Sequence, residues 1–305
     1  MSDEVKVLLL ALGLEAVMGD PVSRWHPVAM FGRVVEAVVR RAPREGRLRP
    51  IAWGGLIVLT GVGGVALGSS LVLQALGSLS TGAGVLAGAV LLKTSFSYRQ
   101  LEHEALGVAG RLEAHDLAGA CTALRALVSR DTANLSVGLA VSAAVESLAE
   151  NLGDSFVAPL LFFVIFGVPG ALAYRAINTL DAMIGYHGVY EYLGRVAARV
   201  DDIANLVPSR LGCFLLVLGA LTTGLDWRAA VRVAIRDHAR TESPNAGWPM
   251  AAMAGAVGIA LEKSGYYRLG DELIERTPVT IRAAVRVTRG AAAIGVLAAA
   301  VGVVR

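Results

Sequence analysis

The chain alternates long apolar runs with shorter polar segments. The longest run, residues 51–92, holds 42 residues without a charged side chain. As one helix it would extend about 63 Å at 1.5 Å per residue, against a hydrocarbon core of roughly 30 Å. A Gly- and Ser-rich stretch at residues 77–84 is typical of a turn. The pattern therefore predicts a charge-free transmembrane hairpin over residues 51–92.

A second apolar run, residues 156–174, is interrupted by Gly-Val-Pro-Gly at residues 167–170. Its first part is only about 16 Å long as a helix, too short to cross a bilayer. We therefore expect a re-entrant helical hairpin, which keeps the polar segments before and after it on one side of the membrane. The later apolar runs, at residues 211–225, 248–261 and 290–304, are each shorter than the ~20 residues of a perpendicular span.

The polar segment after the first hairpin has helical periodicity. Leu101, Ala105, Val108 and Leu112 are spaced four, three and four residues apart, and a second amphipathic run covers residues 117–128. This spacing predicts two packed helices outside the bilayer.

Arginines between residues 33 and 49 place that segment in the cytoplasm by the positive-inside rule, and a hairpin returns the chain to the same side. The predicted fold is an all-α, polytopic integral membrane protein with cytoplasmic-side amphipathic helices, forming a single membrane-embedded catalytic domain over residues 1–305. Its predicted parts are the hairpin (51–92), a polar helical segment (94–154), the helical hairpin with a polar site segment (156–210) and C-terminal helices (211–305).

Composition supports a membrane protein and excludes several functions. Hydrophobic residues make up 55% of the chain and charged residues 17%, and the mean hydropathy is +0.59, which argues against a soluble protein. Cys121 and Cys213 are far apart in sequence and suggest neither a disulfide framework nor a cysteine metal site. The basic residues are 25 Arg and 3 Lys without a nucleic-acid signature. Lipid headgroups or phosphorylated substrates suit this chain better.

Acidic residues recur at helical spacing in one segment. Glu146, Glu150 and Asp154 are four residues apart and lie downstream of Arg130, Asp131 and Asn134. Because each acid at the bilayer centre costs about 2.5–3.5 kcal/mol, the three must face protein, water or a cation. The stripe indicates either a site for Mg²⁺ or a substrate ammonium group, or the solvated face of a cytoplasmic helix.

Two further clusters combine arginine, amide and carboxylate at three-residue spacing. They are Arg175, Asn178 and Asp181, and then Arg199, Asp202 and Asn205, followed by Arg210. Taken singly, either cluster could form structural ion pairs. Together they indicate a phosphate and Mg²⁺ site, because carboxylates hold the metal and guanidinium groups bind phosphate oxygens.

The C-terminal third contains a basic amphipathic pattern and a rigid turn. Arg228, Arg232, Arg236 and Arg240 are four residues apart, with Trp227, Val231 and Ile235 on an adjoining face. This pattern predicts a helix lying on anionic lipid, or a collecting surface for a polyanionic substrate. In the turn over residues 243–249, which contains Asn245, Trp248 is either an interfacial anchor or a flat platform for a ring system.

Specific sequence blocks are spread across nearly the whole chain. They are Gly19-Asp20-Pro21 with His26-Pro27-Val28 and Gly32; Ser129-Arg130-Asp131-Thr132; Glu146-Ser147-Leu148-Ala149-Glu150-Asn151 with Asp154; residues 174–186, from Tyr174-Arg175-Ala176 to Ile184-Gly185-Tyr186; Asp201-Asp202-Ile203-Ala204-Asn205 with Pro208 and Arg210; and residues 243–253. These blocks resemble the CbiB/CobD family, the membrane-associated adenosylcobinamide-phosphate synthases of cobalamin biosynthesis. The chain departs from the pattern at residues 262–265, where Glu-Lys-Ser-Gly replaces the family's Gly-Gly-Pro-Asn before Tyr266-Tyr267.

The resemblance implies an ATP-dependent acid-amine ligase. It would join a carboxyl group of adenosylcobyric acid to the amine of 1-aminopropan-2-ol or its O-phosphate, with Mg²⁺ as cofactor. No GxxxxGK[ST] motif is present, so ATP would not be held by a P-loop. A plausible route phosphorylates the carboxylate before the amine attacks it.

Roles for individual residues follow from the resemblance as hypotheses. Glu146, Glu150, Asp154 and Asp181 would hold Mg²⁺, and either Asp131 or Asp202 would accept the proton of the ammonium group. Arg130, Arg175 and Arg210 would bind phosphate groups. His26 would cap a turn or touch the amide rim of the corrin, and Trp248 would cover the corrin face. The remaining assignments to substrate binding are Asn134, Asn178, Asn205 and Asn245.

The resemblance also implies partners and a location. The partners are the corrinoid, the amino alcohol or its phosphate, and the lipid bilayer, without nucleic acid, while association with other enzymes of the pathway and a homo-oligomer stay open. The location is the plasma (inner) membrane, multi-pass, with the active site facing the cytoplasm.

Two other functions compete. An Mg²⁺-dependent membrane transferase acting on phosphorylated substrates would favour a DxxxD pair, which the core clusters lack. A small-molecule transporter would place ionisable residues inside its spans, whereas here they collect between the apolar runs.

Overall fold

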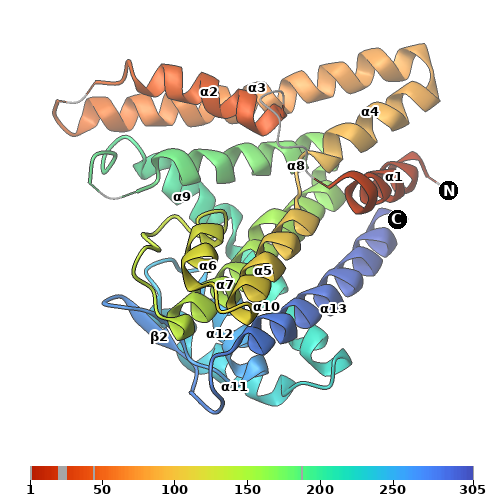
Figure 1. Cartoon of the computed structure of the whole chain (residues 1–305). Helices are drawn as coiled ribbons and strands as arrows, with labels where there is room; N and C mark the ends of the chain where they lie inside the picture. Colours follow the sequence, from red (N-terminus) through yellow and green to blue (C-terminus); the bar gives the residue numbers. More distant parts are fainter. Residues whose placement is uncertain (1, 20–25, 44, 187, 305) are drawn as a thin grey trace. The chain divides into compact units, whose positions relative to one another are not determined.

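The structure, a computed structural model, describes residues 2–19, 26–43, 45–186 and 188–304 and is almost entirely helical (Figure 1). The predicted all-α fold class is confirmed, with a single two-stranded sheet in the described part of the chain. The chain divides into two compact units. Unit 1 comprises residues 1–97, 158–205 and 299–305, and unit 2 comprises residues 98–157 and 206–298.

Unit 1 is a set of mostly apolar helices. In it, α3 packs against α4, α8 and α9, and α1 packs against α4. Its helices are α1 (Asp3–Met18), α2 (Pro27–Val39), α3 (Leu48–Leu79), α4 (Thr81–Lys93), α8 (Ala158–Ile184) and α9 (Arg195–Ala204), with the last residues of α13.

Unit 2 combines helices with a short antiparallel hairpin. In it, α11 packs on α12, and the first strand packs on α7. Its elements are α5 (Tyr98–Glu113), α6 (Leu117–Leu124), α7 (Val137–Leu152), a π-helical turn (Gly153–Val157), α10 (Leu206–Thr222), α11 (Trp227–Asp237), a 3₁₀ turn (His238–Arg240), α12 (Gly247–Val257), β1 (Leu261–Lys263), β2 (Tyr267–Leu269) and most of α13 (Pro278–Val303).

Short polar side chains begin several helices. The backbone N–H of Ala83 donates to the Ser80 hydroxyl at the start of α4, at 3.0 Å, and that of Ala229 donates to Asp226 at the start of α11, at 2.9 Å. These bonds satisfy amide groups that the first helical turn leaves unpaired. The local sequence thus sets where these helices start.

Among the described residues, three helical segments are long and apolar enough to cross a membrane, Leu48–Leu79, Val137–Ile184 and Pro278–Val303, and α9 with α10, bent by 48° at their junction, would be a fourth if they formed one broken span. This agrees with the predicted membrane character. We place α9 outside the membrane-spanning segments, because it has only ten residues and carries two arginines and two aspartates.

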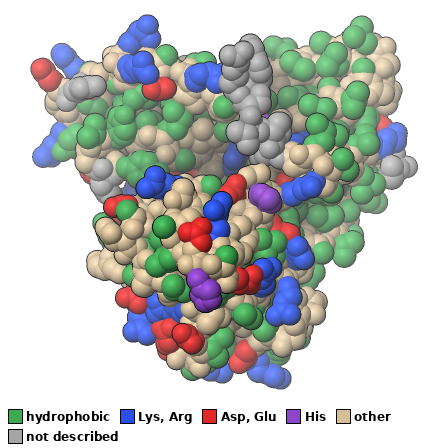
Figure 2. All heavy atoms as spheres, viewed as in Figure 1, with side chains coloured by type: hydrophobic (Ala, Val, Ile, Leu, Met, Phe, Trp, Pro, Cys, Tyr) green, Lys and Arg blue, Asp and Glu red, His purple; other side chains and the backbone are tan. Residues whose placement is uncertain are grey.

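The predicted hairpin over residues 51–92 is present, and its helices meet at Ser80, within the predicted turn. The arms are unequal, however, because α3 has 32 residues and α4 only 13. Figure 2 shows hydrophobic side chains over this hairpin and Lys and Arg side chains at the α2–α3 connection, where Arg40, Arg41, Arg47 and Arg49 are exposed.

The predicted break after Phe166 is confirmed. Gly167 has φ 68° and ψ −166° inside α8, a conformation that favours glycine, and Pro169 follows. The segment before the break is longer than expected, because α7 and the π-helical turn lead directly into α8. The re-entrant path itself stays a prediction.

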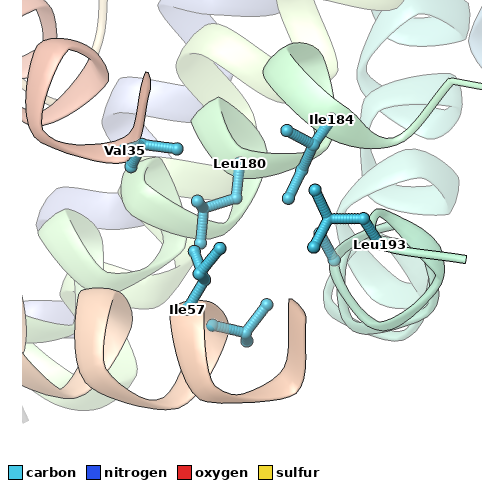
Figure 3. Close-up of a cluster of buried hydrophobic side chains, with 7 residues drawn as sticks. Val35, Ile57, Leu180, Ile184 and Leu193 are labelled. Carbon is cyan, nitrogen blue, oxygen red and sulfur yellow. The ribbon is translucent and has the colours of Figure 1, made fainter. Parts of the chain in front are cut away.

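A hydrophobic core in unit 1 fixes α9 against α3 and α8 (Figure 3). Ile57 of α3, Leu180 and Ile184 of α8, and Leu193 before α9 pack together. The backbones approach closely at Gly194, where a Cβ would lie 1.7 Å from the carbonyl oxygen of Ile184. Any larger residue there would displace the start of α9.

The two predicted helices after the first hairpin are confirmed as α5 and α6, which pack together.

The prediction for the last C-terminal helix was incomplete. The apolar run at 290–304 is the end of the 26-residue helix α13, which begins at Pro278. Arginine is a good helix former, and two arginines of α13 also form ion pairs with α5: Arg282 with Glu113 at 2.6 Å, and Arg289 with Glu102.

A fully buried carboxylate, Asp237, closes the end of α11. It accepts a hydrogen bond from the backbone N–H of Gly270 at 2.8 Å and lies 2.8 Å from Arg236 and 3.2 Å from Arg240. Burial alone would raise the pKa of Asp237, but the bonds from Arg236 and Gly270 outweigh it and hold the pKa below its usual value.

We expect Asp237→Asn to lower the free energy of unfolding by about 3 kcal/mol at neutral pH, because two arginines lose their buried acceptor. Since the folded-state pKa is depressed, the stability that Asp237 contributes is present above the unfolded pKa of about 4 and is lost as pH falls through the folded value. Thermal unfolding between about pH 3 and 7 should show this acid loss in the parent and less of it in Asp237→Asn. Glu242→Gln, an exposed change in the same unit, is the control, and equal acid profiles for all three proteins would contradict the assignment.

Candidate functional site

The first polar cluster lies in unit 1 and joins α8 to α9. Tyr174 is fully buried and its hydroxyl donates to Asn205 Oδ1 at 2.8 Å. Asn205 Nδ2 in turn donates to Asp201 Oδ2 at 3.0 Å. We call Tyr174, Asn178, Asp181, Asp201, Asp202 and Asn205 the α8–α9 cluster.

Asp201 has the most perturbed environment in this cluster. Burial raises the pKa of Asp201 to about 7, and the carboxylates of Asp181 and Asp202 act in the same direction, against the hydrogen bond from Asn205. Its Oδ1 is buried and has no hydrogen-bond partner within the described chain. A carboxylate with a pKa near neutrality can accept and release a proton at physiological pH.

Two arginines, Arg175 and Arg199, border the α8–α9 cluster. Arg199 Nη1 lies 3.5 Å from Asp202, whose side chain is 28% exposed, and Arg175 Nη1 donates to Asn178 at 3.4 Å. The structure thus brings both predicted arginine–amide–carboxylate clusters into one place. It adds Asp201 and Tyr174, which the sequence analysis did not select. The i, i+4 spacing of Asp201 and Asn205 was the signal available for the former.

A second cluster lies in unit 2. Arg130 Nη2 is 3.6 Å from Glu146 on α7, and both side chains are largely buried. Burial raises the pKa of the Tyr267 hydroxyl, on β2, and the carboxylates of Glu146 and Glu150 raise it further. We call Arg130, Glu146 and Tyr267 the Glu146 cluster. The interpretation of the acidic stripe as a solvated face is wrong for Glu146.

The β1–β2 hairpin carries the segment that departs from the family pattern. The hydroxyl of Ser142 on α7 accepts from the backbone N–H of Glu262 at 2.7 Å and donates to its carbonyl at 3.3 Å. Arg276 lies 3.2 Å from the Glu262 carboxylate. The departing residues therefore have structural contacts, and the hairpin that they form positions Tyr267. Sequence reasoning missed Tyr267 because nothing in its spacing relates it to α7.

A third cluster, also in unit 2, surrounds Trp248. Arg210 Nη1 donates to Asn245 at 2.9 Å and to Ser209 at 3.0 Å, and its guanidinium lies 5.4 Å from the centre of the Trp248 ring. His238 stacks on the same indole at 3.8 Å between ring centres. Arg210, Asn245 and Trp248 were predicted separately, and the structure brings them together. We call this group the Trp248 cluster.

The remaining predicted residues lie outside the three clusters. Asp131 and Asn134 are exposed, and Asp131 accepts from the backbone N–H of Ala133 at 2.9 Å. Glu150 and Asp154 are half-buried. His26 begins α2, where Nδ1 accepts from the backbone N–H of Val28 at 3.3 Å, the capping contact expected for it. Asp20 and Pro21 of the N-terminal block lie outside the described residues.

No three His, Cys, Asp or Glu side chains converge on a metal position within the described chain. The predicted set of Glu146, Glu150, Asp154 and Asp181 is therefore not assembled as a complete metal centre there. Mg²⁺ commonly binds through one or two carboxylates together with substrate phosphates and water, so oxygen ligands of this kind still suit it.

Apolar helices of membrane-spanning length, with clusters of carboxylate, amide and arginine packed among them, define a helical membrane protein. Comparison with known proteins gives the family. The model of the CobD/CbiB protein family matches residues 8–293, and the chain belongs to that family. The resemblance drawn from the sequence is confirmed.

Individual relatives match over most of their length. The cobalamin biosynthesis protein CobD of Dehalococcoides mccartyi (strain CBDB1) is 41% identical, over 95% of this chain and 94% of the relative. The protein of that name from Geobacter metallireducens is 39% identical, over 99% and 97%, and that from Klebsiella pneumoniae is 40% identical, over 81% and 79%. No solved structure matches the chain.

Proposed function

We propose that this chain acts in cobalamin biosynthesis as an ATP-dependent ligase. It would join a free propionate carboxyl of adenosylcobyric acid to the amine of 1-aminopropan-2-ol or its O-phosphate. Family membership and the names of the relatives support the pathway. The observation that carries the chemistry is the half-buried Asp201, whose Oδ1 is buried and whose pKa is about 7 beside two further carboxylates.

The reaction needs an activated carboxyl group and a neutral amine. In the proposed sequence a carboxylate oxygen attacks the γ-phosphorus of ATP and ADP leaves. The amine nitrogen then attacks the carbonyl carbon of the acyl phosphate, the C–N bond forms and inorganic phosphate leaves. The amine arrives as an ammonium ion, so it must lose a proton before it attacks. Asp201 is the proposed acceptor. We prefer it to Asp131, which is exposed, and to Asp202, whose carboxylate lies 3.5 Å from Arg199.

Magnesium fits the α8–α9 cluster by ligand type. Asp181 and Asp202 act on each other electrostatically and supply hard oxygen atoms without forming a closed cage. We propose that Asp181 and Asp202 hold the ion, which when bound neutralises the charge of the ATP phosphates. Glu146 is already paired with Arg130, and we propose that it orients this arginine toward a phosphate group.

Other side chains are proposed to bind the substrates. Arg175 and Arg210 offer guanidinium groups to phosphate oxygens, and Trp248 offers an aromatic face to the corrin ring. The arginines at the α2–α3 connection are exposed, which supports an orientation with that connection on the cytoplasmic side of the inner membrane.

The direct test supplies the purified protein, in lipid nanodiscs, with adenosylcobyric acid, the amine and MgATP. We expect a product with the mass of the amide and one phosphate released per amide formed. Running free aminopropanol and its phosphate in parallel identifies the preferred amine. Absence of any amide with either amine, while ATP and the corrinoid remain intact, would refute the proposal.

A further inference from the structure

Helix α11 has two faces of opposite character. Ala229, Ala230, Val233 and Ala234 are buried, and α11 packs on α12. The two backbones are close, because a Cβ built at Gly255 would lie 2.4 Å from the carbonyl oxygen of Ala229. This alanine-rich face is sufficient to hold α11 in unit 2.

The opposite face carries apolar side chains that this packing does not use. Trp227, Val231 and Ile235 are four residues apart and therefore lie along one line of the helix. Val231 is 36% exposed and Ile235 65%. Two exposed branched residues in line with the half-buried Trp227 indicate a surface that is covered in the working protein.

The arginines of α11 divide into two pairs with different roles. Arg236 and Arg240 form ion pairs with Asp237, which corrects the prediction that all four arginines serve one outward face. Arg228 and Arg232 are exposed and form no ion pair within the described chain. The Arg228 guanidinium lies 4.7 Å from the ring centre of Trp227. Two uncommitted positive charges therefore border the apolar line.

The chain reaches α11 directly from an apolar helix. α10 ends at Thr222 and α11 begins at Trp227, so only four residues connect them. Phe214 and Leu221 of α10 are exposed apolar residues, as expected of a helix in contact with lipid. An amphipathic helix with Trp at its start and free arginines, next to such a helix, has the composition of an interfacial segment.

We propose that α11 lies in the membrane interface on anionic lipid. Trp227, Val231 and Ile235 enter the acyl region, and Arg228 and Arg232 bind the negatively charged headgroups. The partner is thus a lipid surface, and the ion pairs of Asp237 keep the end of α11 attached to unit 2. The inference is independent of the proposed ligase reaction.

The test measures the environment of position 235 in the full-length protein. Cys121 and Cys213, both buried, are replaced by alanine, and Ile235→Cys is labelled with the fluorophore NBD. The protein is reconstituted in nanodiscs of phosphatidylcholine alone or mixed with phosphatidylglycerol. With phosphatidylglycerol we expect blue-shifted emission and quenching by acyl-chain spin labels. Each substitution, Arg228→Gln or Arg232→Gln, should lower the ratio of docked to undocked helix about fivefold.

Arg125→Gln, a change of an exposed arginine on unit 2, is the matched control and should leave the emission unchanged. A second label at Val231→Cys guards against a local disturbance at position 235. The proposal is overturned by aqueous emission at both positions in every nanodisc, or by quenching that is equal with and without phosphatidylglycerol. It is also overturned if soluble tripolyphosphate, rather than lipid, changes the emission.

Discussion

Replacing Asp201 by asparagine should lower kcat of the proposed ligase reaction by about 10²- to 10⁴-fold, the range for loss of a general base. Asparagine has nearly the same shape, so contacts with Asn205 can persist, while the proton acceptor is lost. The measurement is the rate of amide formation at saturating MgATP and both substrates, with the folded fraction of each variant checked by thermal unfolding.

The pH profile gives an independent readout of the same residue. The pKa of Asp201 is raised to about 7 without a bound metal, and Mg²⁺ on Asp181 and Asp202 would lower it, so kcat of the parent should rise with pH at or below that value as the carboxylate ionises. This rise should disappear from the residual activity of Asp201→Asn.

Asp202→Asn is the matched control, since Asp202 is its neighbour on the same helix and is partly exposed. We expect Asp202→Asn to need more MgATP for half-maximal rate, because one proposed ligand of the metal is changed, and to lower kcat at saturation less than about tenfold, because the proton acceptor remains. If Asp201→Asn kept nearly full activity while Asp202→Asn lost its activity, the proton acceptor would be Asp202 rather than Asp201.

The second large effect concerns stability in unit 1. Lys93 of α4 lies 3.0 Å from Glu15 of α1, and their side chains are only 9% and 7% exposed. Lys93→Met should lower the free energy of unfolding by about 3–5 kcal/mol, because it removes the cation beside a buried carboxylate. Unfolding in detergent by heat or denaturant measures this difference.

Two further variants separate the buried pair from a general effect of losing lysine. Lys6→Met breaks the exposed pair between Lys6 and Asp3 on α1 and should cost less than about 1 kcal/mol. The double variant Glu15→Gln with Lys93→Met should recover most of the loss, since no unpaired charge remains. If Lys93→Met were as stable as Lys6→Met, the buried pair would not hold α1 to α4.

Much of the fold could be predicted because apolar length and helical spacing are local properties. The turn at Ser80, the break at Gly167 and the pair α5–α6 were all visible in this way. The length of α13 was not, because the sequence analysis identified only its apolar end, residues 290–304. Arg289 and Arg282 of α13 pair with Glu102 and Glu113, which lie more than a hundred residues earlier in the chain, and spacing within a segment does not reveal such pairs.

The site could be predicted in part for the same reason. The motif residues on α8 and α9 were identified from i, i+3 spacing, whereas Tyr174 and Tyr267 depend on tertiary packing.

The sequence argument against a transporter is weaker in light of the structure. Transport was disfavoured because ionisable residues appeared to lie between spans, but Glu146 and Asp181 belong to the apolar segment Val137–Ile184. Family membership, rather than charge placement, now favours the enzyme.

The central claim is that the carboxylates of the α8–α9 cluster hold the metal-bound nucleotide. Iron-directed cleavage tests it most directly: Fe²⁺ replaces Mg²⁺ in the presence of ATP, ascorbate and peroxide are added, and the cut positions are mapped by mass spectrometry. The account predicts ATP-dependent cuts near Asp181 and Asp201 that are lost in Asp181→Asn. ATP-dependent cuts confined to other segments, and unchanged in that variant, would contradict it.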